Sequence, residues 1–326
     1  ELETIDRAML VADDDGRVQA TSWRWSRLRV GVRADSDAAA VWLGGAATVD
    51  ALARTHPPAA LAIILDRRLR GALTPRAGLP VCTPQTSVLF TAGNGGLVLH
   101  EFAHQLEGDL VSRGWSRWGD ALQSPPRLSE KLTLWDDPNR VGLRGFYPVD
   151  DEGRPGERRL LVRRGRVAGY LGDRRRGTGT PRMRPGHGRR ASWREPPAPR
   201  AANLCLAAGD ADAGAVRDER GRVLVVHDLE GGGTDPRSGE MTVRVNDGEW
   251  VEDGRLIAPV AGLDLEGNVL DLLGAVDRLC SDRRPDGGAA TCRRQGSGVP
   301  IGFLTPSFRT RGLAAFGRLP ASRETL

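Results

Sequence analysis

The feature that most constrains this chain is the segment 97–111, in which a His-Glu-x-x-His motif lies among regularly spaced apolar residues. Side chains four residues apart on a helix point the same way, so His100 and His104 can bind one metal ion together. Glu101 lies next to the first histidine and can act as a general base toward water at such a metal. Apolar residues at spacings of mostly three and four would bury the rest of this helix in a core: Leu99, Phe102, Ala103, Leu106 and Leu110. The motif predicts a metal site on a packed helix; the alternative is a helix whose histidines are satisfied by local hydrogen bonds.

Length and composition indicate a globular protein. The 326 residues suffice for two domains, and 39% hydrophobic with 27% charged residues is typical of such chains. No run of 18 apolar residues occurs, so we expect no membrane span. The chain starts without the basic end and apolar core of a signal peptide, and its four cysteines are few and scattered. We therefore predict a cytoplasmic protein without a disulfide framework.

The net charge of +5 is carried almost entirely by arginine, because Lys131 is the only lysine. Such a bias, together with abundant Ala and Gly, is typical of a GC-rich genome. A basic pI alone is weak support for nucleic-acid binding, so we do not predict a nucleic acid as partner.

The order of expected elements predicts the fold class. Residues 1–80 form a small mixed segment, with a helix expected over 37–54 and a buried strand over 61–65. A strand over 83–90 leads through the Gly-rich turn 91–96 into the metal helix. From Lys131 onward, short strands alternate with turns. An antiparallel sheet with helices to one side fits this order, so we predict an α+β fold: a mixed N-terminal segment, 1–80, and a β-rich metal domain, 81–326.

The second half contains several local signals. Residues 160–162 and 167–171 read as a hairpin, and strands over 241–245, 249–251 and 255–260 are expected around tight turns at 246–248 and 253–254. Residues 268–280 predict an amphipathic helix. The Arg-, Gly- and Pro-rich stretch 172–200 reads as an irregular surface loop, or else as a basic flap over a cleft.

A catalytic zinc site needs a third protein ligand and one open position. Glu130 lies at a distance from His104 where one large group of zinc peptidases takes a carboxylate ligand, although prolines before it argue against a regular helix. Cys292 is the rival, because a thiolate is a strong zinc ligand and the glycines around it would permit close approach. Spacing alone scarcely distinguishes Glu130 from Cys292 as the third ligand.

The sequence resembles the TldD/PmbA (TldE) family, the microcin-processing metallopeptidases once described as gyrase modulators. The resemblance begins with the motif at 100–109 and runs in collinear order over about residues 81–318. It rests on a series of blocks: Thr133–Asp137, Asp151–Gly153, Leu160–Gly165, Gly169–Leu171, Arg189–Arg194, Pro199–Leu204, Gly231–Asp235, Ser238–Glu240, Ala258–Val260, Gly267–Asn268, Thr291–Cys292, Gln295–Gly296 and Val299–Pro300.

The resemblance implies a zinc ion on His100, His104 and Cys292, with Glu101 as the catalyst, and so favours Cys292 over Glu130. It further implies extended peptides as substrates and a dimer, either of this chain or with a TldE/PmbA-type homologue that lacks the metal motif. Two features depart from the family pattern. The family has three residues between the glutamate and the second histidine where this chain has two, and Arg293 and Arg294 stand where the family has Gly-Lys.

We therefore predict zinc-dependent hydrolysis of amide bonds in peptides or a peptide-like metabolite, as a processing step in natural-product or peptide maturation. Glu107 and Asp109 are candidates for orienting a ligand histidine, since metal-bound imidazoles usually donate their other N–H to an acceptor. His187 and His227 are candidates for stabilising the oxyanion. The alternative is a non-catalytic or tailoring subunit of a TldD/TldE-type complex in secondary-metabolite biosynthesis.

Overall fold

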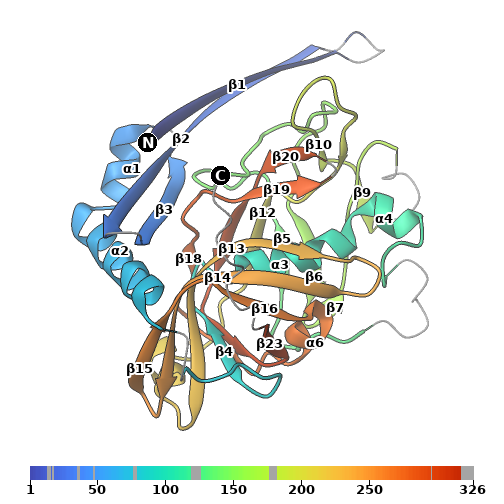
Figure 1. The fold of residues 1–326 in the computed structure, drawn as a ribbon. Coiled ribbons are helices and arrows are strands. Elements are labelled where there is room, and N and C mark those ends of the chain that lie inside the picture. Colours follow the sequence, from blue (N-terminus) through green and yellow to red (C-terminus); the bar gives the residue numbers. More distant parts are fainter. Residues whose placement is uncertain are drawn as a thin grey trace.

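The computed structural model describes residues 1–12, 16, 18–34, 37–46, 48–75, 79–118, 126–175, 182–294 and 296–316. The described part consists of a three-stranded N-terminal sheet with two helices, and a body built on a six-stranded and an eight-stranded sheet. Figure 1 shows the N-terminal part in blue along one side of the body, and the long β-hairpin of this part extends across the top of the view. This mixed, strand-rich architecture confirms the predicted α+β class.

The N-terminal sheet has one face covered by helices. Its strands pair antiparallel in the order β1 (Leu2–Ala12), β2 (Val18–Ala34) and β3 (Asp37–Ala46). The period-2 alternation of β3 turns Val41 and Leu43 toward α1 (Val49–Thr55) and α2 (Pro58–Leu73), where they form a small core with Leu52. Trp42, between them in the sequence, lies on the opposite face of the sheet, toward the body.

Two predictions for this segment were wrong. Residues 37–54 are not one helix, because β3 occupies their first part and α1 begins only at Val49. The apolar run 61–65 lies inside α2 rather than in a strand, with Ile63 exposed and Leu61, Ile64 and Leu65 packed toward the sheet. A short apolar run fits a strand and a buried helix equally well; here it lies in a helix that begins at Pro58 and packs on the N-terminal sheet.

The described residues of the body form two large sheets and three two-stranded ones. The six-stranded sheet has the order β18-β21-β12-β5-β6-β7, and the eight-stranded sheet has the order β17-β22-β4-β13-β14-β16-β23, with β15 paired to β14. The small sheets are β8-β9, β10-β11 and β19-β20. The strands span β4 (Ser87–Phe90), β5 (Leu134–Asp136), β6 (Arg159–Arg163), β7 (Arg166–Val167), β8 (Tyr170–Leu171), β9 (Met183–Arg184), β10 (Gly188–Arg189), β11 (Ala198–Pro199), β12 (Asn203–Leu206), β13 (Arg222–Thr234), β14 (Glu240–Glu252), β15 (Arg255–Val260), β16 (Leu263–Asn268), β17 (Arg278–Leu279), β18 (Arg284–Pro285), β19 (Thr291–Arg294), β20 (Ser297–Pro300), β21 (Gly302–Thr305), β22 (Phe308–Thr310) and β23 (Leu313–Phe316).

Helix α3 (Gly96–Ala103) lies in the main core between the two large sheets. Leu99 and Phe102 of α3 share one buried cluster with Leu204 of β12 and Val226 of β13. The other helices of the body are α4 (Gly108–Ser112), α5 (Ala213–Arg217) and α6 (Val269–Gly274), and a short 3₁₀ helix, η1 (His104–Leu106), follows α3. The predicted strand over 83–90 is present as β4, and the Gly-rich turn does lead into α3. The apolar spacing of the motif therefore buries α3 on both sides.

Two of the three predicted tight turns are present. Arg164 and Gly165, both with positive φ, close the β6–β7 hairpin, and Asp253 and Gly254, likewise with positive φ, join β14 to β15. The turn expected at 246–248 is wrong, because β14 runs through it and changes its partner there from β16 to β15. The buried Asp247 carboxylate accepts two hydrogen bonds from Arg67 of α2, at 2.7 and 2.6 Å, instead of forming a turn.

Two further expectations differ from the structure. The helix expected over 268–280 ends at Gly274, and the chain then pairs as β17 against β22. The stretch 172–200 is only partly described, and its described residues are not simply a surface loop: His187, Arg189 and Arg200 are buried. Composition predicted exposure, but these polar groups find partners inside the body.

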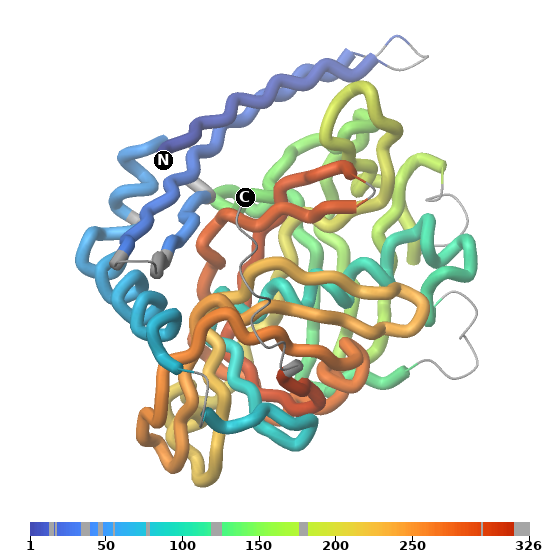
Figure 2. The backbone as a smooth tube through the Cα atoms, viewed as in Figure 1, coloured from blue at the N-terminus to red at the C-terminus, as the bar shows by residue number. Residues whose placement is uncertain are grey.

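The N-terminal sheet contacts the body at both of its ends. Arg7 of β1 forms an ion pair with Asp151 at 2.5 Å, and the backbone N–H of Gly44 in β3 donates to the Gly287 carbonyl at 2.6 Å. A Cβ on Gly44 would lie 2.4 Å from the Gly288 oxygen, so this close approach requires glycine. The tube in Figure 2 follows this segment along the body. Among the described residues, none of the helices combines the length and apolarity needed to cross a membrane.

Candidate metal centre

The metal motif lies where α3 ends. His100 is inside α3, and His104 is the residue at which the helix ends and η1 begins, so the predicted apolar helix is divided into shorter pieces. Glu107 then adopts an extended conformation before α4 starts at Gly108. The backbone at His104 remains helical (φ −56°, ψ −32°), so the spacing of four still places both imidazoles on one side.

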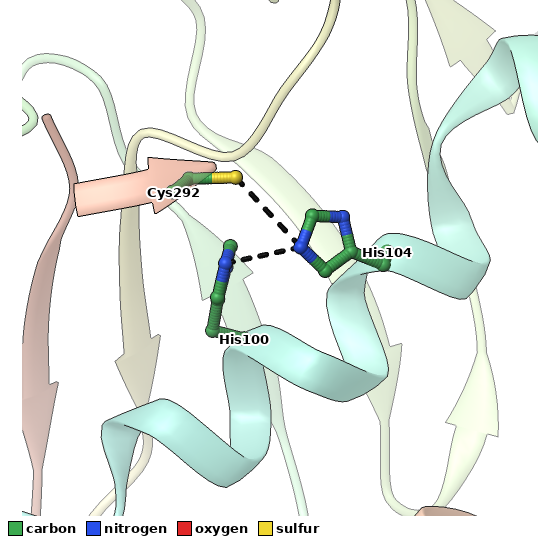
Figure 3. A group of neighbouring side chains, drawn as sticks. All are labelled: His100, His104 and Cys292. Atoms are coloured by element: carbon green, nitrogen blue, oxygen red, sulfur yellow. Dashed lines mark hydrogen bonds between the residues drawn. The ribbon is translucent and has the colours of Figure 1, made fainter. Parts of the chain in front are cut away.

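Three potential metal donors converge from segments far apart in the sequence. The Nε2 atoms of His100 and His104 are 3.1 Å apart, and Cys292 Sγ of β19 lies 3.7 Å from His104 Nε2. The donor atoms all lie within 4.8 Å of one another. Figure 3 shows the three side chains pointing toward one another, two from the helical segment and one from a strand. Two imidazoles and one thiolate form a donor set that suits zinc and leaves a fourth position for a ligand. Glu130, the rival third ligand, is exposed and is not part of this group.

Charged neighbours favour the thiolate form of Cys292. Burial alone would raise the pKa of this thiol, but the imidazoles of His100 and His104 bring the pKa well below its usual value. The buried Arg200 guanidinium donates from Nη2 to Cys292 Sγ at 2.7 Å and to the Cys292 carbonyl at 2.9 Å. A positive donor at both atoms positions the sulfur and stabilises its negative charge.

Glu107 links the second histidine to the arginines around it. Its Oε1 lies 2.9 Å from His104 Nδ1, and its Oε2 accepts a hydrogen bond from Arg294 at 2.7 Å. Arg200 Nε is 3.9 Å from the same carboxylate. Asp109 contacts Arg294 rather than a histidine. Of the two acidic residues proposed to orient a ligand, Glu107 therefore touches an imidazole, and Asp109 acts only through the arginine.

Glu101 is buried beside the donors. Its side chain faces the cavity with 4% of its surface exposed, and burial raises the pKa of its carboxyl above the usual value. A Cβ on Gly232 of β13 would lie 3.0 Å from Glu101 Oε1, so the glycine leaves room for this carboxylate. A carboxylate with a raised pKa is better suited to accept and return a proton near neutral pH.

His100 and His104, together with Glu101, line a cavity of about 960 Å³ between the N-terminal sheet and the body, whereas the Cys292 side chain is buried behind its wall. One wall consists of α3 and the turn before it, with His100, Glu101 and His104. The second wall is the segment 228–234 of β13, and the third is formed by residues of the segment 286–294. The inner face of the N-terminal sheet forms a roof, to which Arg27, Arg29, Ala40 and Trp42 contribute.

The two histidines proposed for oxyanion stabilisation lie elsewhere. His187 is fully buried, with Nε2 3.2 Å from an oxygen of Asp136, and His227 has Nε2 3.5 Å from Glu249. Neither is among the residues that line the cavity. Each histidine pairs with a carboxylate away from the metal donors.

Sequence reasoning missed the roles of Arg200 and Arg294. Arg200 was visible only as part of a family block, and Arg294 only as a departure from the family pattern. Neither has a spacing relation to the motif that would have indicated contact, because Arg200 and Cys292 are 92 residues apart and Arg294 and Glu107 are 187 apart.

A sequence model of the PmbA/TldA metallopeptidase C-terminal domain matches residues 83–316. The chain belongs to the PmbA/TldD family. Its relatives include the "Metalloprotease TldD homolog" of Buchnera aphidicola (subspecies Schizaphis graminum), which is 27% identical over 231 residues, 71% of this chain and 48% of that protein. The TldD homologue of Haemophilus influenzae is 27% identical and covers 68% of this chain and 46% of its own length. This PmbA/TldD member thus spans about half the length of the curated relatives it matches.

Solved structures of two family-like proteins share the fold. A Thermotoga maritima protein, described as a candidate modulator of DNA gyrase, superposes with a TM-score of 0.73 at 17% identity, covering 97% of this chain and 68% of that one. TldE from Thermococcus kodakarensis superposes with a TM-score of 0.70 at 18% identity and the same coverage. Because the curated relatives are metalloproteases, membership of the PmbA/TldD family implies a metal ion at a site such as the one described above.

Proposed function

We propose that this chain is a zinc-dependent hydrolase of amide bonds in peptides or peptide-like metabolites. The observation that supports it best is the convergence of His100, His104 and Cys292 beside the buried Glu101, at the wall of an open cavity. A purely structural metal site would need neither an open cavity nor a buried carboxylate beside the donors, and both are present here.

The protein residues divide the chemical work. His100, His104 and Cys292 would hold the zinc ion, which supplies Lewis acidity toward a carbonyl oxygen and toward water when bound. Glu101 accepts the proton of the attacking water and donates it to the leaving amine, so the carboxylate is regenerated after each cycle. Glu107 keeps His104 oriented through Nδ1, and Arg200 holds the Cys292 sulfur.

An unpaired stretch of strand supports an extended peptide as the substrate. β13 pairs with β4 only through Val223–Val226, whereas its cavity segment, 228–234, pairs only with β14 among the described residues. The second edge of that segment is therefore available for backbone hydrogen bonds to a peptide. Gly232, within it, lies next to Glu101, so a strand bound there would pass close to the catalytic carboxylate.

Glu101→Gln is expected to retain about one zinc per chain and to lose turnover by roughly 10²- to 10⁴-fold, the range for a removed general base. Metal content by mass spectrometry and cleavage of an unstructured peptide measure the two effects. Glu130→Gln is the matched control, because Glu130 is an exposed glutamate outside the metal cluster, and both measurements should be unchanged. Unaltered cleavage by Glu101→Gln would refute the assigned base.

The alternative, a non-catalytic or tailoring subunit of a TldD/TldE-type complex, differs in its need for the metal. A subunit without catalysis has no use for the charged network around the donors, which favours the hydrolase. We further propose that the chain works as a dimer, with itself or with a homologue. Light scattering of the purified chain, alone and with a co-expressed homologue, distinguishes these assemblies.

A further inference from the structure

Some of the arginines that line the cavity form ion pairs with carboxylates of the protein, and others do not. Arg68 pairs with Asp228 at 2.7 Å, Arg27 pairs with Glu3, and Arg294 pairs with Glu107. These cations are already neutralised by the protein.

Two lining arginines have no such partner. Arg29 of β2 and Arg293 of β19 are exposed to the cavity, and neither forms an ion pair or a side-chain hydrogen bond with any described residue. They approach the cavity from different sides, because Arg29 belongs to the roof and Arg293 directly follows the metal donor Cys292. Two cations that face one cavity and have no carboxylate partner among the described residues attract an anion.

The position of Arg29 is restrained. It lies opposite Trp42 in the β2–β3 register, with its guanidinium carbon 5.9 Å from the indole centroid, while Arg27 stacks on the same ring at 4.5 Å. Stacking on an aromatic face restricts an arginine without consuming its hydrogen-bond donors. The planar donor face of Arg29 thus remains available for a carboxylate.

The cavity is also polarised. On the β13 wall, Glu230 is a carboxylate without a cation partner among the described residues, so this wall carries negative charge. A substrate carboxylate would be repelled by Glu230 and attracted toward Arg293 and Arg29. Arg293 lines the same cavity as His100, His104 and Glu101, so this attraction acts in the cavity in which the bond would be cleaved.

We propose that the cleft selects peptides carrying a carboxylate near the scissile bond, held by Arg293 and Arg29. This inference rests on the proposed peptide hydrolysis and names the substrate class. The carboxylate can come from an acidic side chain or from the C-terminus of a short peptide, since both present the same planar anion to a guanidinium.

Binding to the zinc-loaded Glu101→Gln variant tests the proposal independently of turnover. One unstructured peptide is synthesised with Glu or Gln at each position in turn, and with a free or an amidated C-terminus. We expect one of the charged forms to bind roughly tenfold more tightly than its neutral isostere, the effect of about one charge-assisted hydrogen bond. Which form shows the preference identifies the source of the carboxylate.

Arginine variants locate the selectivity. Arg293→Gln and Arg29→Gln should each reduce the preference several-fold without weakening the neutral peptide, and raising the salt concentration should reduce it in the parent. Arg33→Gln is the matched control, since Arg33 is an exposed arginine of the same strand as Arg29 but does not line the cavity. Equal binding of charged and neutral peptides would overturn the proposal, as would an equal loss in Arg33→Gln.

The same peptides separate this inference from the proposed function. If the parent enzyme cleaves the peptides but binds charged and neutral forms equally, the proposed carboxylate site is refuted and the proposed hydrolase activity is not. A charge preference in binding that depends on Arg293, with no cleavage by the parent, would support the site and refute the hydrolase.

Discussion

At the scale of single residues, Glu107 connects the parts of the metal centre. Its carboxylate touches His104 on one side and Arg294 on the other, and lies close to Arg200, which in turn holds Cys292. His104 and Cys292 are 188 residues apart in the sequence, yet the orientation of both depends on one buried acid. A buried carboxylate is stable here because it is paired and hydrogen-bonded.

Glu107→Ala is expected to weaken zinc binding by about 10- to 100-fold, the usual effect of removing a partner that orients a ligand imidazole. Glu107→Gln should weaken it less, because the amide oxygen can still accept from His104 Nδ1 although the charge facing Arg294 is lost. Competition with a chromophoric chelator measures both affinities. Wild-type affinity in the alanine variant would contradict the role given to Glu107.

At the scale of elements, the turn that follows Tyr147 contains a carboxyl group, that of Asp150, whose pKa is raised by burial. The buried Asp150 accepts N–H donors from Glu152 and Arg154 at 3.0 and 2.9 Å, and from Gly188 of β10 at 3.0 Å. Burial nevertheless raises the pKa of Asp150 to about 6, since it disfavours the charge more than the three donors favour it.

This shift predicts a pH-dependent stability. Between about pH 4 and 6 the folded state keeps a proton on Asp150 that the unfolded chain releases, so the free energy of unfolding should fall as pH rises through this window. The contribution is roughly 2–3 kcal/mol, and it should disappear in Asp150→Asn. Urea unfolding of both proteins from pH 4 to 7 measures the difference in slope. Asp286, whose pKa burial also raises to about 6, contributes equally to both proteins, so identical slopes would contradict the prediction.

At the scale of the whole molecule, the metal centre ties together segments that the chain separates widely. His104 and Cys292 are 188 residues apart, and the cavity above them is completed by the N-terminal sheet. The unfolded chain cannot hold these donors together, so binding free energy at this site is also folding free energy.

Removing the metal should therefore lower the melting temperature. With free zinc at a thousandfold excess over its dissociation constant, zinc binding should stabilise the folded protein by about 4 kcal/mol, which raises the melting temperature of a chain of this size by roughly 6 °C. Cys292→Ala should lose most of this difference between zinc-loaded and chelated protein. Scanning calorimetry with and without a chelator measures the difference. An unchanged melting temperature of the parent protein on adding zinc would contradict a zinc site formed by His100, His104 and Cys292.

The sequence by itself determined the features that are encoded within a few residues. The spacing of His100 and His104 on one helical face, and the turns at Arg164-Gly165 and Asp253-Gly254, depend on helical periodicity and on residues that tolerate positive φ. The order of the expected elements indicated the class of fold, and the resemblance favoured Cys292 over Glu130 as the third donor.

Only the tertiary structure decided where partners come from across long stretches of chain. The run 61–65 became helix because α2 packs on the N-terminal sheet, and β14 passes through the expected turn because Arg67 satisfies Asp247. Spacing left Glu130 and Cys292 nearly equal as third ligand; in the structure only Cys292 lies with the two histidines. Spacing in the sequence predicts contacts between residues a few positions apart, whereas the contact of Arg200 with Cys292 joins residues 92 positions apart and forms only when the chain folds.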